Sequence, residues 1–592
     1  MRGGSIRHLG RLPPSRAPRP RRRPGLSKGT SLMSLSFRLS HRTRPHTPSG
    51  TQRWRTVQVA AVTAALGLAT ACGGGPESAQ KDAPGSQDWA TTTPRATGNL
   101  DTANWNLILE PTTLDPQQAS NYGVNDVLSN MCESLQTLNP DFSISDGLAS
   151  LKVENRGKRL VYSIDAKAHF WNGQPVTGAD AAYSLTRAWH PSAQQAPIYN
   201  QYFAAVTAIK ATGPREVTVD LQHPDLLFQK MMATFAGSVV EARYSKAHPD
   251  FGKPSVPPMC SGPYTLKSWK TGSKLTLERN QDYWRGVTAK TRQVVFSFLQ
   301  GDSSQTRALT GGAIQGMYQP PTSALSRLGE HGKVYYGKSL LSFYLVPTAK
   351  TGPLQDPRIR QALFLALNRT AVARTAFGGA AAASRSMLPA DVYGPVKATK
   401  SDGTGGSPDE IAQAKRLVKE AGSPTTKIVL AGAPAISDSL TQSLQAIAEA
   451  ARKIGLNATY KPVTLGQFYD LFSGPQGWRS TGSDAFGSQW NLPVADPQAQ
   501  FSVWANPKDP TNYSQFTDGT ASKLIRQAAA EGDTAKRDEL LARADRRLFD
   551  RLPWVPVVDV ANVLYLDNSV TGPPASFVNW YSPWAQQLGA SK

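Results

Sequence analysis

The sequence predicts an α/β or α+β body in which short strands and amphipathic helices are mixed along the chain. KLTLE at 274–278 alternates polar and apolar residues, which is typical of a half-buried strand. SPDEIAQAKRLVKEAG at 407–422 predicts a helix that opens with a capping box and ends at a glycine. A second capping box predicts a helix from Thr177. Residues 357–377 and 437–454 have apolar side chains at helical spacing and predict two more helices.

The positive charge is concentrated at the start of the chain. Of a net charge of +22 over 592 residues, residues 1–56 carry 14 through Lys and Arg without any acidic residue, which leaves 8 for the remainder. Such a head fits a nucleic-acid arm, a solvated tail or the n-region of an export signal. Val57–Ala71 is uncharged, too short for a membrane span of roughly 20 residues but of the length of a signal h-region. The export signal is therefore favoured, and no nucleic-acid partner is expected.

Cys72 follows the small residues Ala-Thr-Ala, a pattern that resembles a bacterial lipobox. We expect residues 1–71 to be a signal peptide with a long basic n-region, and Cys72 to carry lipid that anchors the protein to the outer face of the cell membrane. Residues 72–99 are rich in Gly, Pro, Ser and Thr, which predicts a flexible tether. An ordinary thiol at Cys72 is the alternative. A start at Met33 and the export route, general secretory or twin-arginine, stay open.

Motifs of catalysis and metal binding are weak. Lys-Thr-Gly at 270–272 recurs at 350–352, and its candidate Ser-x-x-Lys partner at 78–81 falls in the tether. GxSxG, HExxH and CxxC are absent, and the five histidines after Cys72 are scattered. We therefore expect no catalytic residue, metal or cofactor, and a hydrolase is the less favoured alternative. Thirteen Trp and eighteen Tyr fit a protein that binds a small ligand, although most aromatic residues pack in cores.

Seven segments carry a family resemblance when they are read in order. Together they are similar to the extracellular solute-binding proteins of family 5, the peptide, nickel and oligosaccharide receptors of ABC importers, over about residues 100–592. The segments are LEPTTLDP with MCESLQTLNPDFSISDGLA, LVYSIDAKAHFWNGQPVTGADAAYSLTRAW, CSGPYTLKSWKTGSKLTLERNQDYW, DPRIRQALFLALNR, the helix that ends in KEAG, RKIGLNA and RLPWVPVV.

The resemblance implies a two-lobed periplasmic-binding-protein-like fold that closes by a hinge. A subdomain at 146–245 is inserted in the first lobe, which comprises 100–145 and 246–340. The second lobe is expected at 341–552, and 553–592 return to the first.

The implied function is capture of a small solute, with peptide-like compounds among the candidates, and its delivery to the subunits of an ABC permease. The receptor is expected to be a monomer held at the membrane by its lipid. A ligand-sensing or signalling lipoprotein of the same fold is the alternative. Neither reading involves a catalysed reaction.

Alignment with the family points to ligand-contacting residues in both lobes. Arg479 lies in a loop too variable to align and is included because it could pair with a ligand carboxylate in bidentate fashion. The remaining candidates are Ser120, Asn121, Tyr122, Tyr318 and Gln319 from the first lobe, and Tyr344, Trp490 and Asn491 from the second.

One family feature is missing at the expected place. In peptide-binding members an aspartate four residues before a proline takes the amino terminus of the peptide, and here the position four before Pro497 holds Pro493. Asp496 matches a turn aspartate with a structural role. We expect short unblocked peptides to bind poorly, because an unpaired ammonium group costs roughly 1 to 3 kcal/mol or more.

Cys132 and Cys260 are an even pair in an exported chain, which allows a disulfide or two free thiols. The resemblance places both segments in one lobe and therefore favours the disulfide.

Overall fold

The computed structural model describes residues 88–193, 195–348 and 351–592. The predicted signal peptide, the predicted lipidation site Cys72 and the first part of the predicted tether lie outside these ranges. No helix within the described ranges is long and apolar enough to cross a membrane.

The first lobe is built around a parallel core of three strands. The strand Leu100–Asn106 runs parallel to a neighbour on each side, and two antiparallel strands continue the sheet outward. The predicted strand at 274–278 is confirmed, with Leu275 and Leu277 fully buried. The elements of this lobe are β1 (Leu100–Asn106), β8 (Tyr264–Lys270), β9 (Lys274–Arg279), β10 (Thr291–Ser297), β11 (Gly316–Tyr318), α1 (Tyr122–Leu128), α5 (Asp302–Thr310) and α6 (Leu325–His331).

A separate four-stranded antiparallel sheet, in the order β4-β5-β7-β6, interrupts the first lobe. The helix α2 packs on it and starts with the predicted capping box, in which Thr177 and Asp180 exchange hydrogen bonds. This part of the chain contains β2 (Gln136–Leu138), β3 (Ile144–Asp146), β4 (Ala149–Glu154), β5 (Arg159–Ile164), β6 (Val206–Gly213), β7 (Glu216–Leu221), α2 (Gly178–Trp189), α3 (Leu226–Met231) and α4 (Ala242–Ala247).

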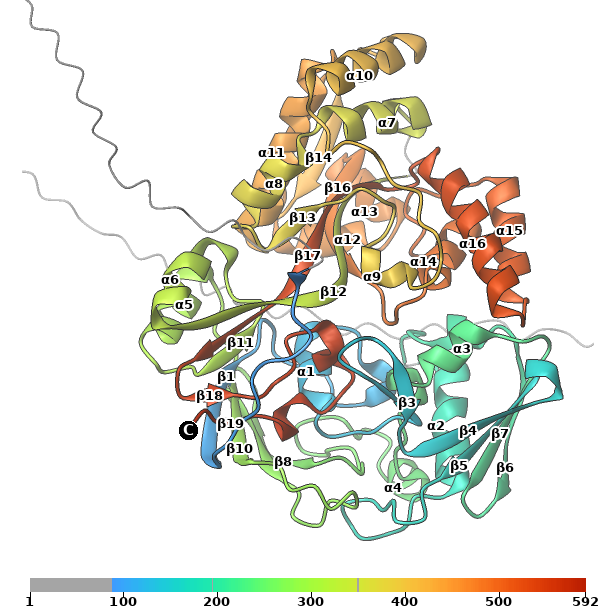
Figure 1. The fold of residues 1–592 in the computed structure, drawn as a ribbon, viewed down its shortest axis with the longest axis vertical. Helices are drawn as coiled ribbons and strands as arrows, with labels where there is room; N and C mark the ends of the chain where they lie inside the picture. The colour runs from blue at the N-terminus through green and yellow to red at the C-terminus, as the bar shows by residue number, and fades with distance from the viewer. Residues whose placement is uncertain (1–87, 194, 349–350) are drawn as a thin grey trace, which may run out of the picture. The chain divides into compact units, whose positions relative to one another are not determined.

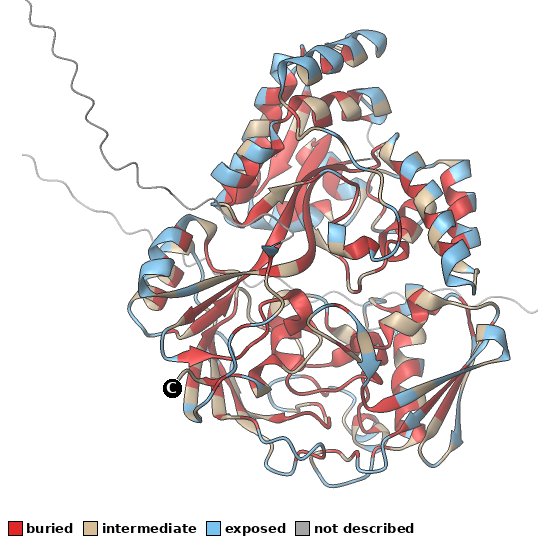
Figure 2. Cartoon of the chain, viewed as in Figure 1, coloured by how far each residue is buried: buried red, intermediate tan, exposed pale blue. Residues whose placement is uncertain are grey.

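The second lobe has a central parallel strand, β14, between β15 and β16, and helices pack around these strands. Figure 2 shows that α10 and α11 turn buried residues inward and exposed ones outward. The elements are α7 (Pro357–Ala366), α8 (Arg369–Ala376), β13 (Ala381–Ala383), α9 (Ala390–Tyr393), α10 (Pro408–Glu420), β14 (Ile428–Gly432), α11 (Asp438–Lys453), β15 (Ala458–Pro462), α12 (Leu465–Leu471), α13 (Pro475–Thr481), β16 (Ala485–Asn491), α14 (Gln498–Ala505), α15 (Gly519–Ala529) and α16 (Thr534–Phe549).

Two long antiparallel strands, β12 (Gly332–Pro347) and β17 (Val555–Asp567), connect the lobes. They join all the main strands into one sheet, in the order β15-β14-β16-β12-β17-β11-β1-β10-β9-β8, with β13 paired to β17 (Figure 1). Their pairing is interrupted between Gly337 and Leu341, so that Lys338, Ser339 and Leu340 leave the regular ladder. The chain thus passes between the lobes once along each strand, and the irregularity lies at the passage. The short strands β18 (Val570–Thr571) and β19 (Gly589–Ala590) follow β17.

Cys132 and Cys260 form a disulfide within the first lobe, with a Cα–Cα distance of 5.0 Å. Both residues are almost completely buried.

Two predictions of local structure are wrong. The predicted helix at 357–377 is two helices, because Asn368 stands between them and its Oδ1 accepts a hydrogen bond from the backbone N of Ala371, which starts α8. The tether was predicted to extend to residue 99, but residues 89–98 pack on the body. Trp89 is 5% exposed, and the backbone N of Ala90 donates to the carbonyl of Tyr336 on β12.

Candidate functional site

The loop before α1 carries three predicted residues of the first lobe. Asn121 is the N-cap of α1, and its side chain accepts a hydrogen bond from the backbone N of Val124 at 3.2 Å. This fixes the start of the helix. Tyr122 is therefore held at the first helical position, where its ring packs edge-on against Trp580, with 4.4 Å between ring centroids. Ser120 is exposed at the tip of the loop.

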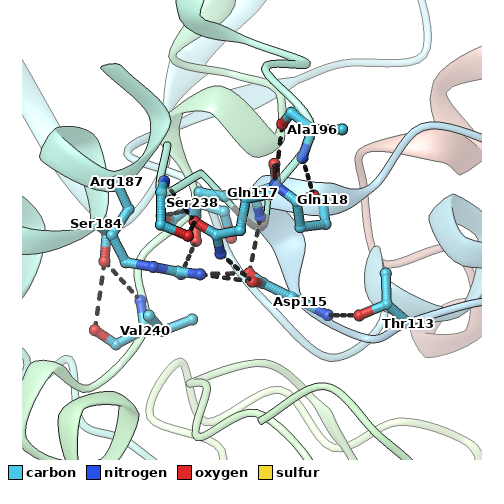
Figure 3. A network of polar contacts seen from close by, with 11 residues as sticks. Thr113, Asp115, Gln117, Gln118, Ser184, Arg187, Ala196, Ser238 and Val240 are labelled. Atoms are coloured by element: carbon cyan, nitrogen blue, oxygen red, sulfur yellow. Dashed lines mark hydrogen bonds and ion pairs between the residues drawn. The ribbon is translucent and has the colours of Figure 1, made fainter. Parts of the chain in front are cut away.

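A buried polar network behind this loop fixes it to the inserted subdomain (Figure 3). Arg187 of α2 donates to both carboxylate oxygens of Asp115 at 3.2 and 2.5 Å, and to Oε1 of Gln117 at 2.6 Å. Gln118 exchanges two hydrogen bonds with the backbone of Ala196. Because charge-assisted, bidentate hydrogen bonds are strong and directional, the segment 115–118 gives Tyr122 a rigid base.

Gln319 faces the same place from the end of β11. Its φ of +54° lies in the left-handed region, which is costly for a residue with a side chain. Its Nε2 is buried without a hydrogen-bond partner among the described residues. Burial raises the pKa of Tyr122 to about 12, and the neighbouring Gln319 amide acts in the opposite direction. Backbone strain and a buried amide beside a tyrosine hydroxyl are the combination expected at a binding site.

Trp490 and Asn491 stand at the end of β16 in the second lobe, next to the interrupted part of β12. Both are partly buried, and Trp490 pairs across the strands with Ser342. The Trp490 ring rests edge-on against Trp554 at 5.3 Å and Tyr513 at 6.3 Å. These contacts orient the indole while part of it stays accessible, so it can present an aromatic surface to a ligand.

The other predicted residues are placed elsewhere. Tyr318 is in the first-lobe core, with its hydroxyl bound to the carbonyl of Pro574 at 2.8 Å. Tyr344 is in the second-lobe core, with its hydroxyl bound to the carbonyl of Met387 at 3.0 Å. Arg479 is exposed on α13. The structure therefore groups Tyr122 with Gln319 and places Trp490 with Asn491, and it gives the two tyrosine hydroxyls partners within the fold.

The sequence missed Asp559, a carboxylate of β17 that is 8% exposed and lines a cavity of about 220 Å³ at the passage between the lobes. The sequence contains a signal that could have identified it, because Asp559 is the one charged residue in the apolar run VPVVDVANVLYL. Among the described residues, no group of three or more His, Cys, Asp or Glu side chains is arranged to hold a metal ion.

Two lobes joined by two crossing strands define the architecture of a two-lobed binding protein. The model of the bacterial extracellular solute-binding proteins, family 5, matches residues 143–512, and the chain belongs to this family. It is accordingly a solute-binding protein of the type that serves ABC importers.

Relatives match over most of the chain at low identity. The oligopeptide-binding protein OppA of Bacillus subtilis is 22% identical over 507 residues, which cover 80% of this chain and 90% of the relative. The glutathione-binding protein GsiB of Escherichia coli K12 is 22% identical over 474 residues, covering 78% and 89%. The solved structure of DppA from Helicobacter pylori with the peptide STSA has a TM-score of 0.71 at 18% identity, covering 84% and 99%. The members of this family are binding proteins rather than enzymes.

Proposed function

We propose that this protein is a lipid-anchored, monomeric receptor that binds its solute at the passage between the lobes and transfers it unchanged to an ABC permease. The lobes proposed are 100–340, with the subdomain at 146–245 inserted, and 341–552, with 553–592 returning to the first. Lipid on Cys72 keeps the receptor at the outer face of the membrane and raises its concentration near the permease.

One observation supports this site above the others. Gln319 follows β11 and Trp490 lies on β16, two strands that flank the interrupted pairing of β12 and β17, and Tyr122 lies beside Gln319. A solute held there contacts both lobes, so its binding energy favours the closed arrangement of the hinge. The Nε2 group of Gln319 provides a donor and Trp490 provides an aromatic face.

The named relatives bind oligopeptides and glutathione, which supports a peptide-like solute for this chain. Pro493 supports a restriction on that class, because it offers no carboxylate to a free amino terminus. We expect trialanine to bind more weakly than micromolar, since its ammonium group loses water at this position without gaining a partner. Calorimetry that gives micromolar or tighter affinity for trialanine overturns this restriction.

Native mass spectrometry of the mature protein purified from its own host tests the proposed function. The expected spectrum shows a diacyl mass on the new amino-terminal cysteine and one small solute per chain, recovered chemically unchanged. A chain with no solute in any preparation, or one that recovers only cleaved products, contradicts the proposal.

A further inference from the structure

The cavity at the passage between the lobes contains a carboxylate whose hydrogen bonds are incomplete. Ser342 and Ser384 donate to Asp559 at 2.7 and 2.6 Å, and both bonds end on Oδ1. Oδ2 receives no hydrogen bond from the described residues. Asp559 is 8% exposed, and it forms part of the cavity wall. Oδ2 can therefore accept a hydrogen bond from a ligand in the cavity, and such a bond to a mostly buried carboxylate adds affinity.

The residues that line the cavity carry more negative than positive charge. Lys338 lines the cavity, but its Nζ is paired with Asp391, another lining residue, at 3.2 Å. Arg369 lies nearby, but its guanidinium donates to the backbone carbonyls of Ser384, Phe364 and Gly403. Burial raises the pKa of Asp559 to about 6, so the carboxylate is ionised at neutral pH. The lining therefore carries two carboxylates and one ammonium group, while the positive charge of Arg369 lies outside the lining and is attracted by Glu410 as well as by Asp559, which favours a cation in the cavity.

Strand register connects this cavity to the candidate site. Ser342 on β12 is directly opposite Trp490 on β16 and directly opposite Asp559 on β17. Residues opposite one another in adjacent strands project to the same face of the sheet. Asp559, Ser342 and Trp490 therefore form one row on one face, with Trp490 and the carboxylate at its two ends.

The dimensions of the cavity determine what part of a solute it can hold. A volume of about 220 Å³ is below the roughly 300 to 1,000 Å³ of sites that enclose a whole drug-sized ligand. The cavity can therefore hold one end group of a solute. Trp89, Pro389 and Ala390 give the wall an apolar part, and an indole face attracts cations.

We propose that this cavity is the subsite for a cationic end group of the solute, an alkylammonium or guanidinium group that donates to Oδ2 of Asp559 and is also attracted by Asp391. The proposal rests on the proposed function and specifies its solute class. It places the cation-binding group on β17 instead of on the segment after β16 that holds Pro493. A cation at the end of an aliphatic stem meets this requirement, whereas the α-ammonium group of a short peptide is attached directly to its backbone.

Butylammonium and guanidinium are suitable probes, with butanol and urea as neutral counterparts of similar shape. We expect both cations, and neither neutral compound, to bind the mature, solute-free protein in calorimetry. Asp559→Asn keeps an oxygen for the two serine hydroxyls but removes the charge, and we expect it to weaken cation binding about tenfold or more. The exposed Asp470→Asn on α12 is the matched control and is expected to bind like the wild type.

Lys338→Met is expected to change the affinity for cations in the opposite direction to Asp559→Asn. It removes the one ammonium group among the described residues of the cavity wall and takes the ion-pair partner from Asp391, so we expect tighter cation binding than in the wild type. A variant that gains affinity must be folded. Lys338→Met therefore tests the proposal even if Asp559→Asn does not fold. Equal affinity of the wild type and Asp559→Asn for the cations, or equal binding of the neutral counterparts, overturns the proposal. A neutral or anionic solute in the native mass spectrum overturns it too, while the proposed function then stands.

Discussion

Lys230 of α3 forms an ion pair with Asp496 of the second lobe, with 2.8 Å between Nζ and Oδ2, and the same Nζ donates to the carbonyl of Ala495 at 3.1 Å. The bond therefore joins the inserted subdomain to the opposite lobe, at a distance from the crossing strands. A contact of this kind stabilises the arrangement in which the lobes meet, and so contributes to solute affinity through closure.

Lys230→Met is expected to weaken solute binding about fivefold. The Lys230 side chain is 36% exposed, so the pair is partly screened and contributes about 1 kcal/mol. The dissociation constant of the co-purified solute is the measurement, with Lys210→Met on β6 of the same subdomain as the control. Equal affinities of the two variants would show that the ion pair does not act in closure.

Asp496→Asn is expected to lower the free energy of unfolding by about 3 kcal/mol or more. Asp496 is fully buried and also accepts hydrogen bonds from Arg537 at 2.8 and 2.9 Å, and Arg537, 4% exposed, would keep its charge without a partner. Urea unfolding at neutral pH measures the loss, and Asp470→Asn is again the control. A loss no larger than that of the control would contradict the assignment.

Asp496 also makes the free energy of unfolding depend on pH. Burial raises the pKa of Asp496, but Arg537 and Lys230 outweigh this and hold it below its usual value of 3.8. Its contribution to stability is therefore complete above about pH 4 and is lost as the pH falls through the lowered pKa. The acid side of the stability curve should be shallower in Asp496→Asn than in the wild type.

Gln319→Gly is expected to raise the free energy of unfolding by about 1 kcal/mol, because glycine adopts the positive φ without strain. The same variant should bind solute more weakly, since the buried amide donor is lost. Gln319→Ala separates the two effects, because it loses the amide but keeps the strain, and it should show weaker binding without the stability gain. If Gln319→Gly binds as well as the wild type, the amide does not contact the solute.

Asp559→Asn is expected to make the solute-free protein more stable at pH 7.5, by up to roughly 3 kcal/mol. The folded-state pKa of Asp559 is raised by burial from 3.8 to about 6, so its contribution to stability is present below pH 3.8 and is lost as the pH rises through 6. The difference between variant and wild type should therefore vanish near pH 3.5. Thermal unfolding across this pH range measures it, and a variant less stable than the wild type at pH 7.5 would contradict the sign.

Helix starts that depend only on residues close together in the sequence were predicted correctly from their capping residues. The capping box of Ser407 and Glu410 starts α10, and that of Thr177 and Asp180 starts α2, as expected. The helix expected at 357–377 failed for a local reason, because its apolar spacing continues through Asn368, which caps a new helix.

The candidate site was only partly predictable, because it depends on contacts between distant segments. Tyr318 and Gln319 are adjacent in sequence and were predicted together, but only the positive φ of Gln319 separates a core side chain from one that lies beside Tyr122. Asp559 is the one charged residue in an apolar strand, and the sequence shows that much. Its hydrogen-bond donors are Ser342 and Ser384, which precede it by more than 170 residues and could not be identified from the sequence.

Hydrogen–deuterium exchange with and without the co-purified solute tests the central claim most directly, namely that one solute bridges both lobes at the crossing strands. The predicted result is slower exchange in four segments, 119–124 and 317–320 of the first lobe, 337–342 of β12 and 488–492 of the second lobe. Protection confined to one lobe, or located away from β12 and β17, would contradict the account.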